Sequence, residues 1–146
     1  MKNITNTGAI IILFSTLFIM SCTVEPSEIT YGEDQCSGCK MIIADSRFGC
    51  QLVTAKGKVT KYDAIECLMP AYIAKDETSW AYVLVSDYME PGSQIDASNA
   101  TYLISKAHPS PMGMYLSAYQ SDPGDAALLN GEAEVLSWSQ LQQKFK

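Results

Sequence analysis

The stretch FGCQLVTAKGKVTKY, residues 48–62, decides the fold of this chain. Residues 48–54 and 58–62 are rich in β-branched and aromatic side chains, which favour β-strands. Between the two runs lies Ala55-Lys56-Gly57, and glycine can take the positive φ that a tight turn requires. The stretch therefore predicts an antiparallel β-hairpin.

A helix is expected directly after this hairpin. Asp63 and Glu66 have the spacing of a helix N-cap and its capping box. Apolar side chains then recur on one helical face, at Ile65, Leu68, Met69, Tyr72 and Ile73. Pro70 lies too far inside for a first-turn position, so a kink or break is expected there. Residues 80–86, WAYVLVS, form the strongest predicted strand and complete a loop–β–β–α–β half.

The second half predicts a similar order of elements. Residues 87–98 are expected to be a connection, and residues 101–105 and 114–119 are expected to be strands joined by an irregular loop over 106–113. A short helix over 122–129, a strand over 133–136 and a last helix capped by Ser137 should follow, with Trp138, Leu141 and Phe145 as the buried stripe of that helix. We therefore expect an α+β fold of two small ββαβ-like units, with antiparallel hairpins and helices on one face.

The N-terminus has the features of an export signal. Lys2 precedes an apolar run over residues 9–20, which is too short to span a bilayer as a permanent helix. Ile19-Met20-Ser21-Cys22 resembles the bacterial lipoprotein cleavage box, which would make Cys22 the lipidated first residue; ordinary cleavage near Ser21 is the alternative. Residues 1–21 are thus expected to be a signal peptide, residues 22–33 a tether, and residues 34–146 one domain with halves 34–89 and 90–146.

Composition restricts the partners of this domain. The formal net charge is −6, which argues against nucleic acid or anionic lipid as the main partner. The sequence shows no Ser–His–Asp set and no phosphate-cradling glycine loop, and it contains one histidine. Hydrolytic catalysis is therefore not expected, and we predict that the protein is not an enzyme.

The chemistry is expected at Cys36-Ser37-Gly38-Cys39-Lys40-Met41. A CxxC turn brings two sulfurs within reach of one ion, and thiolate and thioether donors prefer Cu(I) or Zn(II) to hard cations. A thioether at Met41 favours Cu(I), although Met41 beside Ile42 and Ile43 also suits a core position. Lys40 is expected to favour the thiolate by its charge. Outside the cytoplasm, Cys36, Cys39, Cys50 and Cys67 could instead form two disulfides.

A second group of donors lies in the loop over residues 106–113. Met112 and the only histidine, His108, are candidates for a remote ligand, while core filling by Met112 and Met114 and a solvated His108 are the alternatives. Cys50 and Cys67 lie on the first strand and the following helix. We expect a disulfide or two buried free thiols there, not two ligands.

The ordered set of motifs resembles the NosL family, the copper-binding accessory lipoproteins of nitrous oxide reductase. The resemblance runs from about residue 34 to residue 131 and rests on the lipoprotein signal and on the following motifs: Cys36-x-x-Cys39-x-Met41, Asp45, Phe48-Gly49, Lys56-Gly57-Lys58, Tyr62-Asp63-Ala64, Glu66-Cys67 and Ser110-Pro111-Met112-Gly113. Gly38 departs from the pattern, because an aromatic residue often precedes the second motif cysteine. Cys50 fits no family motif.

The resemblance implies a fold of two ββαβ units and Cu(I) delivery in the cell envelope, from a lipid anchor at Cys22 that faces the periplasm. It implies Cys36, Cys39 and Met41 as Cu(I) ligands, Met112 as a remote one, and nitrous oxide reductase and its maturation machinery as partners. Two alternatives stay open: a thiol-disulfide oxidoreductase that uses Cys36 and Cys39, and a structural zinc or disulfide module. Thioredoxin-like chemistry needs a CxxC that opens a helix, and the polar residues 31–35 before this motif do not suit that context.

Overall fold

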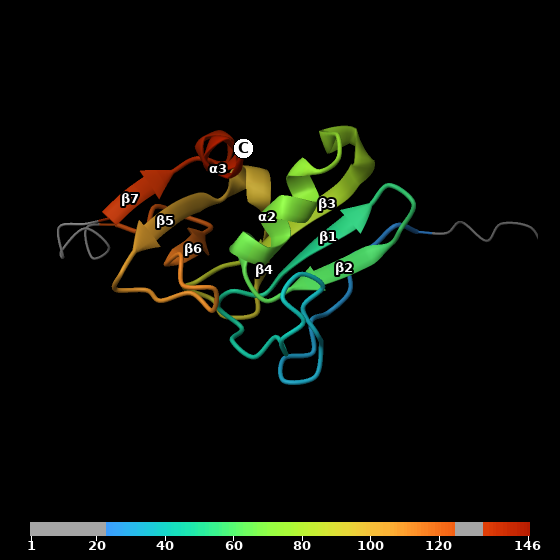
Figure 1. Ribbon diagram of the computed structural model, residues 1–146, viewed down its shortest axis with the longest axis horizontal. Coiled ribbons are helices and arrows are strands. Elements are labelled where there is room, and N and C mark those ends of the chain that lie inside the picture. The colour runs from blue at the N-terminus through green and yellow to red at the C-terminus, as the bar shows by residue number, and fades with distance from the viewer. Residues whose placement is uncertain (1–22, 125–132) are drawn as a thin grey trace, which may run out of the picture.

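The computed structural model describes residues 23–124 and 133–146 (Figure 1). Its regular elements, in chain order, are β1 (Cys50–Thr54), β2 (Val59–Tyr62), α2 (Ile65–Ile73), the 3₁₀ turn η1 (Glu77–Ser79), β3 (Trp80–Ser86), β4 (Gln94–Asp96), the 3₁₀ turn η2 (Ala97–Asn99), β5 (Thr101–Ser105), β6 (Leu116–Tyr119), β7 (Ala133–Leu136) and α3 (Trp138–Phe145). Two antiparallel sheets and two helices make an α+β fold, as the sequence predicts.

The first sheet is built around the predicted hairpin and has the strand order β2-β1-β3-β4. In β1, Leu52 pairs with Thr60 of β2 on one side and with Val83 of β3 on the other. The turn between β1 and β2 has φ +82° at Gly57, which confirms the predicted role of that glycine. Strand β1 is buried on both faces, because it lies in the middle of the sheet between two layers of chain.

Residues 27–29, which the sequence assigns to the tether, form one of the two layers that cover β1. The Gln51 amide on β1 bonds the backbone of Ser27 twice, Ser27 N to Oε1 at 3.1 Å and Nε2 to Ser27 O at 3.0 Å. Ile29 is buried in the core. The packed part of the chain therefore begins before residue 34, since a polar pair and one apolar side chain attach residues 27–29 to the sheet.

The connection expected over residues 87–98 contains two short elements. Strand β4 pairs with β3, Val85 opposite Ile95, and η2 follows it at once. Strand β4 thus belongs to the first sheet although it lies beyond the predicted boundary at residue 90. The sequence missed it because three residues, Gln94-Ile95-Asp96, are too few to show an alternating pattern.

The second sheet has the order β6-β5-β7, and α3 packs against it. Strands β5, β6 and β7 fall on their predicted segments, except that β6 begins at Leu116 instead of residue 114. Ser137 caps α3 as predicted, and Gln140 completes a capping box with it. Leu141 is fully buried, and Trp138 and Phe145 pack against the same core. The helix predicted over residues 122–129 lies mainly outside the described residues.

Helix α2 differs from the expectation at its N-cap and at Pro70. Its N-cap position is Ala64 and no side chain caps it, so Asp63 and Glu66 do not form the predicted capping box. The helix also continues through Pro70 to Ile73, so it is not broken there. Its predicted apolar face is buried at Ile65, Leu68, Met69 and Tyr72, and this burial holds the helix together across the proline.

One hydrophobic core joins the two sheets. Side chains from both sheets and both helices belong to the same buried cluster, in which α2 contacts β1, β2 and β6 and also packs against α3. An isolated parallel bridge between Asp87 and Ala118 connects the end of β3 to β6, with Tyr88 N bonded to Ala118 O at 2.9 Å. The two halves therefore share one core. No helix among the described residues has the length and apolar character to cross a membrane.

Truncation of Leu141 tests the role of α3 in this shared core. Leu141→Ala should lower the free energy of unfolding by about 2–5 kcal/mol, because it leaves a cavity where α3 meets the core. Val135→Ala is the matched control, since Val135 on β7 is 45% exposed and should change stability by less than about 1 kcal/mol. Urea unfolding followed by circular dichroism measures both, and equal effects of the two variants would contradict a core role for α3.

Candidate metal centre

A tight loop carries the CxxC motif. Gln35 and Ile42 form an isolated antiparallel bridge that closes the loop. Inside it, Cys36 N bonds Met41 O at 2.8 Å and Lys40 N bonds Cys36 O at 3.1 Å. Lys40 takes φ +68°, a left-handed conformation that turns the chain back on itself. These bonds place Cys36 and Cys39 in a turn with no helix after it.

The loop sits on the first turn of α2 and brings a third cysteine to the motif. The sulfurs of Cys36, Cys39 and Cys67 all lie within 4.8 Å of one another. Three sulfurs at about 2.3 Å from one shared ion would lie about 4 Å apart, so only a small contraction would let all three bind it. No histidine or carboxylate of the described residues joins this group of three.

Gly38 allows this close approach of loop and helix. A Cβ atom at Gly38 would lie 3.1 Å from Cys67 Cβ and 3.2 Å from the Cys67 carbonyl oxygen. The carbonyl is part of the helix backbone and cannot rotate away. A side chain at position 38 would therefore push the loop and α2 apart by a few tenths of an ångström, and the glycine that departs from the family pattern fits without such a shift.

Two of the three thiols, Cys36 and Cys67, differ in acidity. Burial raises the pKa of Cys36, but the backbone N–H groups of Asp63, Cys39 and Gly38 and the thiol of Cys39 donate to its sulfur and lower its pKa below the usual range. Burial and the neighbouring charge of Cys36 raise the pKa of Cys67 far above that range. The thiolate form is therefore favoured at Cys36 and disfavoured at Cys67.

One predicted role near the motif is corrected by this geometry. Lys40 Nζ donates to Ser37 O at 2.7 Å, and backbone N–H groups of Asp63, Cys39 and Gly38 stabilise the Cys36 thiolate. Asp63 is buried, and its carboxylate accepts a hydrogen bond from the backbone of Ala44. Asp63 thus fixes the loop to the strand end through its side chain and its N–H, instead of capping α2.

Cys50 lies outside the group of three. It is fully buried on β1, and burial raises the pKa of its thiol well above the usual value. Its sulfur donates to Tyr62 O at 3.8 Å. The four described cysteines are all free thiols, so the predicted pair of buried free thiols at Cys50 and Cys67 is found in place of a disulfide. Cys67 is the ligand candidate that sequence reasoning missed.

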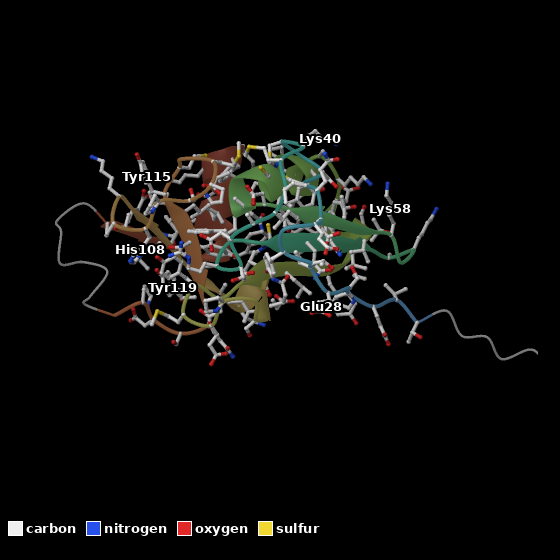
Figure 2. The ribbon with its side chains drawn as sticks, turned by 90° about the horizontal axis from the view of Figure 1, so that it is seen from below. Glu28, Lys40, Lys58, His108, Tyr115 and Tyr119 are labelled. Atoms are coloured by element: carbon white, nitrogen blue, oxygen red, sulfur yellow. The ribbon has the colours of Figure 1, made fainter. Side chains whose placement is uncertain are left out.

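The other predicted ligands lie on the surface. Met41 is 48% exposed and Met112 is 40% exposed, so neither fills the core. Figure 2 shows sulfur atoms along the edge of the molecule between the labelled side chains of Lys40 and Tyr115. His108 lies elsewhere: its Nδ1 is 2.9 Å from Tyr119 Oη, and its ring stacks on Tyr88 with centroids 4.6 Å apart.

A buried carboxylate holds the Met112 loop against the cysteine-bearing turn of α2. Ser110 Oγ donates to Glu66 Oε1, and Glu66 is the residue before Cys67. Burial raises the pKa of Glu66, which hydrogen bonds from Ser110 and from the backbone of Met114 and Leu116 partly offset. The segment around Met112 is therefore fastened to the same turn that carries Cys67, while His108 faces an aromatic cluster.

The family follows from a comparison with known proteins. The NosL family model matches residues 26–143, which is most of the chain. The chain belongs to the NosL family. Among solved structures it resembles the copper chaperone NosL from Shewanella denitrificans, with a TM-score of 0.68 and 15% identity over 84% of this chain and 98% of that one. A search of curated protein sequences returned no match. The NosL fold is thereby shown at low sequence identity.

The group of three sulfurs predicts that metal binding by this protein depends on Cys67 and not on Cys50. In the reduced protein, Cd(II) should give thiolate-to-metal charge-transfer absorption that Cys67→Ser lowers by about one third, because one of three soft ligands is removed. Cys50→Ser is the matched control, a second buried thiol whose loss should leave the absorption unchanged. Equal absorption in the wild type and in Cys67→Ser would remove Cys67 from the site.

Proposed function

We propose that this chain is a lipid-anchored, extracytoplasmic Cu(I) chaperone that delivers copper for the maturation of nitrous oxide reductase in denitrification. The single observation that carries the copper part is the convergence of the Cys36, Cys39 and Cys67 sulfurs within 4.8 Å in a protein of the NosL family. The name of the similar Shewanella denitrificans structure, a copper chaperone, supports the same role. Delivery to the reductase and the periplasmic location rest on the family resemblance.

The composition of the site favours Cu(I) over Zn(II). Structural zinc sites are almost always tetrahedral with four protein ligands. Here three sulfurs converge, and no fourth ligand from a described histidine or carboxylate lies within the same range. Cu(I) prefers soft thiolate and thioether donors, and the proposed ligands Met41 and Met112 would add thioethers. A three-sulfur site of this kind suits Cu(I) and leaves zinc incompletely coordinated.

The position of the site suits transfer. Cys39 is half-buried while Cys36 and Cys67 are buried, so a bound ion would be open to solvent on the Cys39 side. A ligand from a partner could attack there and replace Cys39 without release of a free ion. Cys36 and Cys67, which are buried, would leave after Cys39. This is the chemistry of a carrier and requires no catalytic group.

A metal titration of the reduced protein tests the copper proposal. One equivalent of Cu(I) should bind tightly, and Zn(II) should bind clearly more weakly. Cys36→Ser and Cys39→Ser should each weaken Cu(I) binding by more than about 100-fold, beyond the 10–100-fold effect of outer-shell changes. Competition with a chromophoric Cu(I) chelator measures the affinity, and circular dichroism should show a native fold in both variants.

Three results would point elsewhere. Stronger binding of Zn(II) than of Cu(I), or unfolding of the two serine variants, would favour a structural zinc module. Absence of metal binding together with a readily reversible Cys36–Cys39 disulfide would favour a thiol-disulfide oxidoreductase.

A second prediction concerns Cu(I) affinity and tests the proposed ligands Met41 and Met112 and the Ser110–Glu66 contact. Met112→Ala should weaken Cu(I) binding by about tenfold, and Ser110→Ala should do the same by releasing the Met112 loop from Glu66. In a Met112→Ala background, Ser110→Ala should have no further effect, because its role is to place Met112. Met41→Ala should also weaken binding.

His108→Ala is the control for these variants, since His108 packs on Tyr88 and Tyr119. A loss of Cu(I) affinity in His108→Ala and not in Met112→Ala would reverse the assignment of the remote ligand.

A further inference from the structure

Three lysines meet in a cleft at one end of the first sheet. The cleft has a volume of about 390 Å³ beside the turn between β1 and β2, and it is lined by Thr54, Ala55, Lys56, Lys58, Lys75 and Ser79. The chain has sixteen acidic and ten basic residues, and Arg47, Lys61 and Lys144 form ion pairs. No described carboxylate forms an ion pair with Lys56, Lys58 or Lys75. An acidic protein therefore keeps three uncompensated positive charges in one place.

The backbone around these lysines is well defined. Gly57 N bonds Thr54 O at 2.8 Å and Lys58 N bonds Thr54 Oγ1 at 3.0 Å, so Lys56 and Lys58 are held on either side of a closed turn. Lys75 Nζ lies 5.2 Å from the centroid of the Trp80 ring. The nearest acidic neighbours of Lys75 in sequence are Asp76 and Glu77, and Glu77 accepts a hydrogen bond from Tyr72 Oη at 3.2 Å.

The N-terminal segment passes this turn. A Cβ atom at Gly57 would lie 3.8 Å from Val24 Cγ2, and Val24 is two residues after Cys22. Two residues of extended chain span at most about 7 Å, so a lipid on Cys22 would begin close to the turn. Both views place the N-terminal segment at this end of the molecule, where Figure 2 labels Lys58, and His108 lies at the opposite end.

We propose that Lys56, Lys58 and Lys75 form a surface that docks on the phosphate groups of anionic phospholipids. Ammonium groups near an anionic leaflet are attracted to it, and the attraction from several of them adds to a lipid anchor. Because the chain has a net negative charge, an anionic bilayer would repel the domain in other orientations. The docked domain has one orientation on the bilayer, with the β1–β2 turn against the headgroups. The proposal rests on the lipid anchor in the proposed function and is independent of copper.

Acylation of lysines in the full lipidated chain tests the docking. The protein is placed in nanodiscs of phosphatidylcholine alone, or of phosphatidylcholine and phosphatidylglycerol in equal parts, and is labelled with an N-hydroxysuccinimide ester. Mass spectrometry of peptides reads each lysine. Labelling of Lys56, Lys58 and Lys75 should fall about threefold or more in the anionic discs, while labelling of the exposed Lys146 should stay the same.

A pair of matched variants separates docking from simple shielding. In Lys56→Gln/Lys58→Gln, Lys75 remains as a reporter and should lose its protection in anionic discs. Lys106→Gln/Lys146→Gln removes the same charge outside the cleft and should keep the protection of Lys75. Cu(I) affinity should be the same in both variants, so failure of the copper proposal would be seen separately.

Four outcomes would overturn the docking surface. Protein that leaves the discs with Cys22 unmodified would remove the anchor on which the surface depends. Equal labelling in the two kinds of disc, with the anchor in place, would show that the lysines stay in solvent. Protection of Lys75 in Lys56→Gln/Lys58→Gln would show that the other two lysines are not needed. Protection by soluble glycerol phosphate without a bilayer would make the cleft a site for small anions.

Discussion

The fold depends on burial of the apolar face of helix α2, because strands of both sheets pack against this helix. Leu68, Met69 and Tyr72 lie in a cluster that receives side chains from both sheets and from α3. The same helix carries Cys67 and Glu66 in its first turn, one under the cysteine loop and one bonded to Ser110. Packing of this one helix therefore decides both how the halves of the chain combine and which residues surround the three sulfurs.

Backbone geometry, more than charged side chains, controls the cysteine group. The loop closes at the Gln35–Ile42 bridge, and the N–H groups of Gly38, Cys39 and Asp63 point at the Cys36 sulfur. Fixed N–H dipoles stabilise an anion without a mobile counter-ion, as in other backbone nests. A soft cation that arrives at the site therefore meets a ready thiolate at Cys36, while the Cys67 thiol must release a proton on binding.

Two regions of the molecule have different chemistry. One region holds the sulfurs of Cys36, Cys39 and Cys67 where the cysteine loop meets α2. The end beside the N-terminal segment holds three lysines in a cleft. The length of strand β2 separates these regions, because Ser37 N bonds Lys61 O near its end and Lys56 and Lys58 lie before its start. Attachment through the lysines therefore uses none of the residues of the cysteine group.

Much of the fold was determined by the sequence alone. Runs rich in β-branched and aromatic residues predict strands such as β1, β2 and β3, and Gly57 predicts the turn between β1 and β2. The spacing of Leu68, Met69 and Tyr72 predicts the buried face of α2, and Ser137 predicts the start of α3. These are local signals, because a strand or a cap depends on near neighbours in the chain. Strand β4 and the real cap position of α2 were not predicted, since short elements and buried carboxylates depend on tertiary contacts.

The residues of the candidate site also divide into those that the sequence marks and those that only the tertiary structure brings in. CxxCxM marks Cys36 and Cys39 in the sequence, but nothing in the spacing of Cys67 or Cys50 tells which of the two joins them. Only the tertiary structure decides it: Gly38 lets the loop rest on the first turn of α2, where Cys67 points, while Cys50 is enclosed in β1. Likewise, Ser110 and His108 lie in one loop, and packing alone directs the first to Glu66 and the second to Tyr119. Residues far apart in the chain become neighbours through burial, and burial is a property of the whole fold.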